Sequence, residues 1–284
     1  MTESIYAKKI RPSDMILLGL VLLSAFISVA ILVGIIVYVA FRGVGTINWQ
    51  FLSTVQSALN GTFGIIGNIV NTLYIIVITL IIATPIGIGS AVYLTEYAKR
   101  GRIVRIIEFT TETLAGIPSI IYGLFGMVFF GTSIKLGFSI LCGSLTLTIM
   151  VLPTIIRTTQ EALKSVPESY RSGALGIGAT KWYMIRTIIL PSAMPGIITG
   201  VILSIGRIVG ESAALLFTAG SAYLLPKSLF SHIFTPGGTL TIQLYLSMAK
   251  ADYTNAFGIA LVLLIIVLGI NALAKFMAGK LSKN

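Results

Sequence analysis

Long apolar stretches dominate the sequence, and short polar or basic stretches separate them. The first apolar run covers residues 15–41 and contains no charged residue. A helix that crosses a membrane needs about 20 apolar residues, so this run predicts an uncleaved first membrane span; it is too long for the core of a signal peptide. The later apolar runs predict five further spans, at about 65–95, 110–130, 136–156, 191–218 and 254–274.

Residues 219–253 are less apolar, and a window at 228–249 competes as a seventh span. The basic residues decide between the two arrangements, because lysine and arginine concentrate in cytoplasmic loops. Six spans with an internal N-terminus leave few basic residues outside, whereas a seventh span also moves the basic C-terminal tail outside. We therefore predict six spans, both termini in the cytoplasm, and an outer loop at 219–253 with a short or re-entrant helix. The basic residues left outside are Arg42, Lys135, Lys227 and Lys250.

The composition agrees with a membrane protein, since 56% of the residues are hydrophobic, 10% are charged and the mean hydropathy is +0.97. We expect an all-α integral membrane protein with a single domain over residues 1–284. The net charge of +11 does not predict nucleic-acid binding, because the basic residues form short clusters between the spans.

The lack of a second cysteine and of a phosphate-loop motif limits the chemistry that this chain can perform. Cys142 is the single cysteine, which excludes an intrachain disulfide or a thiolate metal site; we expect it to face lipid or to pack between helices. The sequence has no phosphate-loop motif. We therefore expect that this chain does not hydrolyse ATP and holds no cofactor of its own.

The longest polar-leaning stretch, residues 161–191, predicts a helix-turn-helix. Gly178 is placed to close a first helix that starts near Lys164, because glycine readily adopts the left-handed conformation at a helix end. Thr180 is placed to cap a second helix. Small residues at 173, 174, 176 and 178 would let the backbone of another protein approach closely, and basic side chains fringe the turn. These basic side chains are Arg171, Lys181 and Arg186.

The same stretch follows the spacing EAA-x3-G-x9-I-x-L-P, with Ser172 and Gly173 in place of the first two letters. This spacing resembles the cytoplasmic loop of ABC importer permeases, which implies that the loop couples the membrane domain to an ATPase. The charge of the family's Glu is missing, whereas every fixed position from Ala174 onward is matched. The alternative is an ordinary basic connector. The positions concerned are Ser172, Gly173, Ala174, Gly178, Ile188, Leu190 and Pro191.

Arg207 and Glu211 are ionisable residues inside the predicted fifth span. An arginine at the bilayer centre costs roughly 2.5–3.5 kcal/mol on insertion scales, so it needs a partner or a polar pathway. Residues four apart share one helix face. Arg207 could hold a tetrahedral oxyanion through its guanidinium fork, and Glu211 could accept a hydrogen bond from a protonated anion oxygen, which phosphate has and sulfate lacks. A structural ion pair is the alternative.

The third predicted span is interrupted by Gly116-Ile117-Pro118-Ser119, since proline lacks the amide hydrogen that a helix needs. A helix that restarts here points free N–H groups and its positive dipole end into the membrane, with Ser119 as a cap. This arrangement favours the passage of an anion, but a kink used only for packing is equally consistent. Glu108 and Glu112, at the start of this span, are predicted to be solvated or paired with the nearby basic cluster.

Several stretches together resemble the PstA permeases of phosphate-specific ABC importers. They are GIPSIIYGLFG at 116–126, VLPTIIRTTQEAL at 151–163, LPSAMPGIITGVIL at 190–203 and GESAALLFTAG at 210–220, and the resemblance covers about residues 65–220. The family usually continues Glu-Thr-Ala-Pro after the last glycine, whereas this chain has Ser212 and Ala214.

The resemblance implies a six-span permease in the lipid of the cytoplasmic (inner) membrane. Such a permease pairs with a PstC-like permease, sits on two ATPase subunits that bind ATP and Mg, and receives phosphate from a binding protein on its outer face. It places Arg207 and Glu211 on the phosphate path, and the break in the third span adds Ser119 as a candidate for the same path. The alternatives are a PstC-like paralogue, a sulfate or molybdate permease, an ATP-independent channel or secondary transporter, and a structural or sensory subunit.

Overall fold

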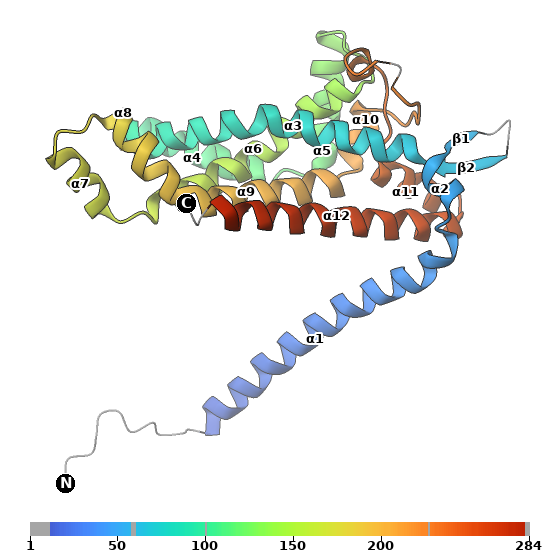
Figure 1. The fold of residues 1–284 in the computed structure, drawn as a ribbon, viewed down its shortest axis with the longest axis horizontal. Helices are drawn as coiled ribbons and strands as arrows, with labels where there is room; N and C mark the ends of the chain where they lie inside the picture. Colours follow the sequence, from blue (N-terminus) through green and yellow to red (C-terminus); the bar gives the residue numbers. More distant parts are fainter. Residues whose placement is uncertain (1–11, 58–60, 100, 227, 282–284) are drawn as a thin grey trace.

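The computed structural model describes residues 12–57, 61–99, 101–226 and 228–281. It is a bundle of long helices that carries α7 and α8 at one end and the β1–β2 hairpin at the other (Figure 1). The elements, in chain order, are α1 (Pro12–Gly43), η1 (Val44–Thr46), α2 (Trp49–Ser53), β1 (Val55–Ser57), β2 (Thr62–Ile65), α3 (Ile66–Val92), η2 (Tyr93–Tyr97), α4 (Arg102–Ala115), α5 (Ser119–Gly126), η3 (Met127–Ser133), α6 (Ile140–Lys164), α7 (Glu168–Gly176), α8 (Lys181–Met184), η4 (Ile185–Ile189), α9 (Leu190–Gly210), α10 (Ala213–Thr218), η5 (Ser231–Phe234), α11 (Leu240–Ala249) and α12 (Tyr253–Leu281).

The helices agree with the predicted membrane protein. Among the described residues, five helices are long and apolar enough to cross a membrane, or six if the bent pair of α4 and α5–η3 counts as one span. The β structure in this part of the chain is a two-stranded antiparallel hairpin. Of the basic positions used to predict the topology, Lys227 and the tails at 1–11 and 282–284 lie outside the described residues.

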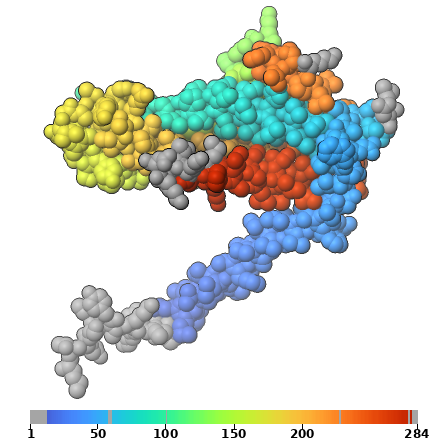
Figure 2. All heavy atoms as spheres, in the orientation of Figure 1, coloured from blue at the N-terminus to red at the C-terminus, as the bar shows by residue number. Residues whose placement is uncertain are grey.

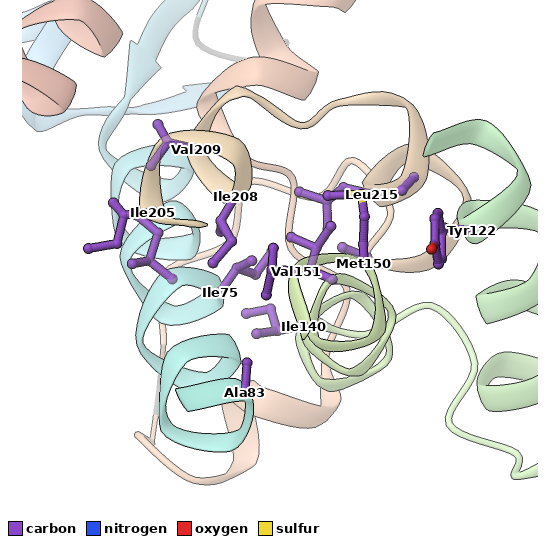
Figure 3. Packing of buried hydrophobic residues seen from close by; sticks show 14 of the residues in the cluster. Ile75, Ala83, Tyr122, Ile140, Met150, Val151, Ile205, Ile208, Val209 and Leu215 are labelled. Atoms are coloured by element: carbon purple, nitrogen blue, oxygen red, sulfur yellow. The ribbon is translucent and has the colours of Figure 1, made fainter. Parts of the chain in front are cut away.

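The centre of the bundle is formed by α3, α6 and α9, with α12 packed against α9. Their contact surfaces bury large apolar side chains such as Ile75, Met150 and Ile208 (Figure 3). Glycines let the helices approach one another closely, as at Gly200, where an added Cβ would overlap the Thr158 side chain. Close approach through small residues is the usual way in which helices pack inside a membrane.

The first span, α1, extends away from the bundle (Figures 1 and 2). The C-terminal end of α1 contacts the start of α12, where the Tyr38 and Phe257 rings meet edge to face with centroids 5.6 Å apart. Along the rest of α1 the apolar side chains are exposed, for example Phe26 at 71%. A helix that is apolar all round needs lipid or another protein around it.

Three spans differ from their predicted limits. The third, formed by α4 and α5–η3, begins at Arg102 rather than 110 and reaches Ser133. The fifth is one continuous helix over Lys181–Gly210, so it begins and ends earlier than predicted. Pro191 does not start it, because the π-helical segment η4 precedes this proline and continues directly into α9. The altered hydrogen bonding of a π-helical segment helps to accommodate a proline, which lacks the amide hydrogen and clashes with the preceding turn of an α-helix. The fourth, α6, begins at Ile140 rather than 136, where the Ser139 hydroxyl accepts a hydrogen bond from the Cys142 N–H at 3.1 Å.

The predicted short helix within 219–253 is α11, a ten-residue apolar helix that packs against α12. The loop before it is attached to α3 through His232, which is 3% exposed and whose Nε2 lies 2.8 Å from Asn71 Oδ1. Burial lowers the pKa of His232. This histidine therefore serves as a neutral structural link between the loop and the bundle.

Candidate functional site

The polar stretch forms the predicted helix-turn-helix, α7 and α8. Gly178 has φ +85° and ends α7, its N–H donating to the Leu175 carbonyl at 3.0 Å. The next amide, of Ala179, donates to the Ala174 carbonyl at 3.1 Å. These two bonds are the Schellman pattern, which satisfies the last carbonyls of a helix. Thr180 then caps α8 through its side chain, as predicted.

The motif residues of this loop divide between the interior and the surface. Ala174 is 4% exposed and packs in an apolar cluster with Met184 and Ile185. Ile188 and Leu190 pack against the same cluster. The prediction that Ala174 is free to contact a partner is therefore wrong, because its methyl group joins α7 to α8 and η4.

The outward surface of the turn is formed by Ser172, Gly173 and Gly178, with Ile177 beside them. An added Cβ at Gly173 or Gly178 meets no atom within 4 Å, so the turn is open to close approach. Ile177 is 86% exposed and Trp182 is 61% exposed. An apolar side chain this exposed in a polar turn is typical of a contact with another protein.

We expect Gly178→Ala to weaken the end of α7 by about 1–2 kcal/mol, because a Cβ is strained at positive φ. Gly173→Ala is the matched control, because Gly173 lies within α7 and, as at Gly178, an added Cβ meets no atom there. Inside a helix, alanine is more favourable than glycine by about 1 kcal/mol, so this variant should stabilise α7. Amide hydrogen exchange over α7 measures both changes. Equal protection in the two variants would contradict this account of the turn.

Arg171 does not fringe the turn, which corrects the prediction. Its side chain is 14% exposed and turns inward, with Nη2 donating to Glu96 Oε1 at 2.9 Å. The same side chain donates to the Leu163 carbonyl at 2.8 Å and the Val166 carbonyl at 2.9 Å. The hydrogen bond to Glu96 raises the pKa of Arg171, so the guanidinium stays charged.

Sequence reasoning did not identify Glu96 as a functional residue. Its side chain is 5% exposed and lies in η2, the π-helical turn that follows α3. A lone carboxylate at the end of an apolar span was the available signal, since a buried charge requires a partner. The partner is 75 positions away, so spacing along the chain does not indicate it.

A second group of candidate residues lies where α9 ends. Arg207 is in the last turn of α9, and Glu211 follows the helix with extended backbone (φ −80°, ψ 127°). The two residues therefore do not share a helix face, and the predicted arrangement is wrong. Glu211 instead caps the next helix, with Oε1 accepting from the Ala214 N–H at 3.0 Å, while the Thr241 hydroxyl donates to the Glu211 carbonyl at 2.7 Å. These bonds replace those of a continued helix.

Arg207 and Glu211 are both half-buried, and the described residues contain no ion pair between them. Neighbouring Gly206 and Gly210 have no atom within 4 Å of an added Cβ, so no described helix packs against them on that side. Both glycines are exposed in the described structure.

The broken third span bends by 102° between α4 and α5–η3. Ser119 is the first residue of α5 rather than its cap, which corrects the prediction, because Pro118 occupies the capping position and has no polar side chain. α5 packs against α10 at Gly123, where an added Cβ would lie 2.8 Å from the Ala214 Cα. The structure thus brings α5 beside the residue that Glu211 caps, although no contact joins Ser119 to Arg207 or Glu211 in the described part.

The carboxylates at the start of the third span pair with α6, and among the described residues they form no ion pair with the nearby basic cluster. Arg157 lies 3.4 Å from Glu112, and Lys164 lies 4.0 Å from Glu108. All four side chains are more than 40% exposed, so each pair contributes at most about 1 kcal/mol. Over the described ranges, no group of His, Cys, Asp and Glu side chains is arranged to hold a metal ion.

Comparison with known proteins gives a consistent result. The family model described as "Binding-protein-dependent transport system inner membrane component" matches residues 83–284. The probable ABC transporter permease protein YqgI of Bacillus subtilis is 35% identical over 95% of this chain and 97% of its own length. The phosphate transport system permease protein PstA 1 of Mycobacterium tuberculosis is 35% identical over 83% of this chain and 75% of its own.

A solved bacterial alginate ABC transporter, in complex with an alginate-bound periplasmic protein, has a similar fold. One of its chains superimposes with a TM-score of 0.69 at 18% identity, covering 96% of both chains. At this identity the likeness concerns the fold.

Proposed function

Because the chain belongs to the family of binding-protein-dependent transport system inner membrane components, we propose that it is the permease subunit of an ATP-driven importer of inorganic phosphate. ABC transporter permeases of this family are membrane subunits, and the ATPase is a separate partner. The resemblance to PstA permeases supports phosphate as the substrate and a PstC-like permease as the second membrane subunit. Two ATPase subunits and a phosphate-binding protein complete the proposed importer.

We place α7 and α8 on the cytoplasmic side of the inner membrane. Lys164, Lys181 and Arg186 gather at this end of the bundle, in agreement with the concentration of basic residues in cytoplasmic loops. The described parts of α1 and α12 begin and end toward the same side (Figure 1), as an even number of spans requires. The exposed turn around Gly173 and Ile177 then faces the ATPase.

The proposal that the substrate is phosphate rests on Arg207, which is half-buried. This arginine lies in the last turn of a membrane span, between the exposed Gly206 and Gly210, and has no carboxylate partner in the described structure. A charge in this position is stabilised by an anion or by water in a pathway. Glu211, whose Oε1 is held by the Ala214 amide, would accept a hydrogen bond from a protonated anion oxygen, which favours phosphate over sulfate.

The proposed mechanism is alternating access. ATP binding closes the ATPases, the α7–α8 turn moves with them, and the bundle opens outward to accept phosphate from the binding protein. Hydrolysis resets the turn and opens the pathway inward. Such a cycle requires that the two conformations bind phosphate and ATP with different affinities.

The test is uptake of labelled phosphate into vesicles that contain this chain, a PstC-like partner, the ATPase and the binding protein. We expect import that requires ATP and is not reduced by excess sulfate or molybdate. Import without the ATPase subunits would indicate a channel or secondary transporter. Equal competition by sulfate would overturn phosphate as the substrate while leaving the importer class intact.

A further inference from the structure

The contacts of Arg171 join three elements at one point, which we call the Arg171–Glu96 joint. From α7, the guanidinium reaches Glu96 in η2 at 2.9 Å and the carbonyls of Leu163 and Val166 at the end of α6. The carboxylate is 5% exposed and the arginine side chain is 14% exposed. Charge-assisted hydrogen bonds that are shielded from solvent to this extent are strong and directional.

Few other contacts connect α7 to α3 and α6. Ala174, the buried residue of α7, belongs to an apolar cluster with α8 and η4 that also includes Ala91 of α3 and Leu163 of α6. A cleft of about 840 Å³ separates α7 from the start of α4 and is lined by Gly101, Arg105 and Glu168 together with the joint itself. A displacement of α7 therefore reaches α3 directly through the joint, whereas the apolar contacts of Ala174 reach α3 by way of α8 and η4.

The structure on the other side of the joint can carry a displacement across the bundle. Glu96 lies in the π-helical turn η2, which the Ala98 N–H closes onto the Tyr93 carbonyl at 2.9 Å, and π-helical turns are frequent at functional sites. Beyond this turn, α3 is a rod of 27 residues, about 40 Å long at 1.5 Å per residue. At its far end, Asn71 bonds the loop that precedes α11.

We propose that the Arg171–Glu96 joint transmits the movement of the ATPase-facing turn to α3, and that Arg171 and Glu96 are positioning residues for coupled transport. The proposal rests on the proposed function, because it assumes that α7 moves with an ATPase. It assigns a mechanical role to a buried ion pair within this chain, distinct from the surface that contacts the ATPase.

The test compares Glu96→Gln with Glu168→Gln in the complete importer. Glu168 also pairs with Arg171, at 3.3 Å, but lies on α7 itself with 82% exposure, so its loss removes a charge pair without disconnecting two elements. Phosphate imported per ATP hydrolysed should fall about fivefold or more in Glu96→Gln, the size of a typical coupling between sites. Glu168→Gln should stay within about twofold of wild type.

A double variant, Glu96→Met with Arg171→Met, separates transmission from stability. Replacement of a buried ion pair by apolar side chains of similar volume often preserves stability. We expect this variant to assemble with the thermal stability of wild type and still to hydrolyse ATP with little import. If instead it regains normal import per ATP, the joint is only structural and the proposal is wrong.

The remaining outcomes are also decisive. Normal import per ATP in Glu96→Gln would overturn the joint while leaving the proposed function in place. A wild-type complex that does not couple ATP hydrolysis to phosphate import would overturn the proposed function, and the joint with it. The amount of assembled complex, measured by co-purification of the ATPase, corrects each rate for misfolded protein.

Discussion

Arg207→Gln is expected to lower phosphate import by about 10- to 100-fold, because a hydrogen bond to a charged group contributes about 1.5–3 kcal/mol. Glutamine keeps much of the side-chain length and can donate hydrogen bonds, but it lacks the positive charge that would hold a phosphate oxyanion. The measurement is the initial rate of ATP-dependent phosphate uptake. Because Arg207 is half-buried and has no ion pair within the described residues, the complex should still assemble.

Two further variants show whether the loss of import in Arg207→Gln is specific to this position and to the shape of the arginine side chain. Arg42→Gln makes the same change in the last turn of α1, where the guanidinium lies 5.6 Å from the centre of the Tyr38 ring, and we expect normal import. Arg207→Lys keeps the charge but loses the two-pronged donor, so its rate should fall between those of wild type and Arg207→Gln. Normal import in Arg207→Gln would make the arginine structural and direct the search for the anion site to the start of α5.

The features that sequence analysis predicted well depend on local causes. An apolar run long enough to cross a membrane has few alternatives to a helix, so the first, second and last spans were located close to their observed limits. The helix-turn-helix was predictable because Gly178 and Thr180 act on neighbouring amides and carbonyls. The short helix within 219–253 followed from the charge distribution and its moderate hydropathy.

The errors have causes that are distant in the sequence. α9 ends at Gly210 because the Glu211 side chain caps α10. In addition, the hydroxyl of Thr241, 30 positions away, donates to the Glu211 carbonyl. Arg171 turns inward because Glu96 meets it from α3. The bond from Thr241 and the pairing with Glu96 have no signature in local spacing, and the same letters would otherwise favour a longer helix and an exposed arginine.

The bend of the third span shows how an unexpected contact can also matter for function. Gly-Ile-Pro predicted a kink, but its direction depends on the packing of α5 on α10 and α6, and the close contact with α10 depends on Gly123. The Phe217 ring lies 3.3 Å from the Cβ that alanine would add there. The neighbouring α10 begins with the amides that Glu211 caps, so a change in the α5–α10 distance also moves the candidate anion site.

Gly123→Ala is therefore expected to reduce both stability and import. The added Cβ would lie 2.8 Å from the Ala214 Cα and 3.1 Å from its carbonyl oxygen, and a backbone cannot rotate away as a side chain can. Overpacking of this kind costs about 1–3 kcal/mol, and Gly123→Val should cost more. Gly116→Ala, in the same broken span, meets its nearest atom at 3.5 Å and should unfold like wild type. Thermal unfolding of the assembled complex and phosphate uptake measure the two effects, and equal behaviour of the two alanine variants would show that α5 and α10 are not in close contact.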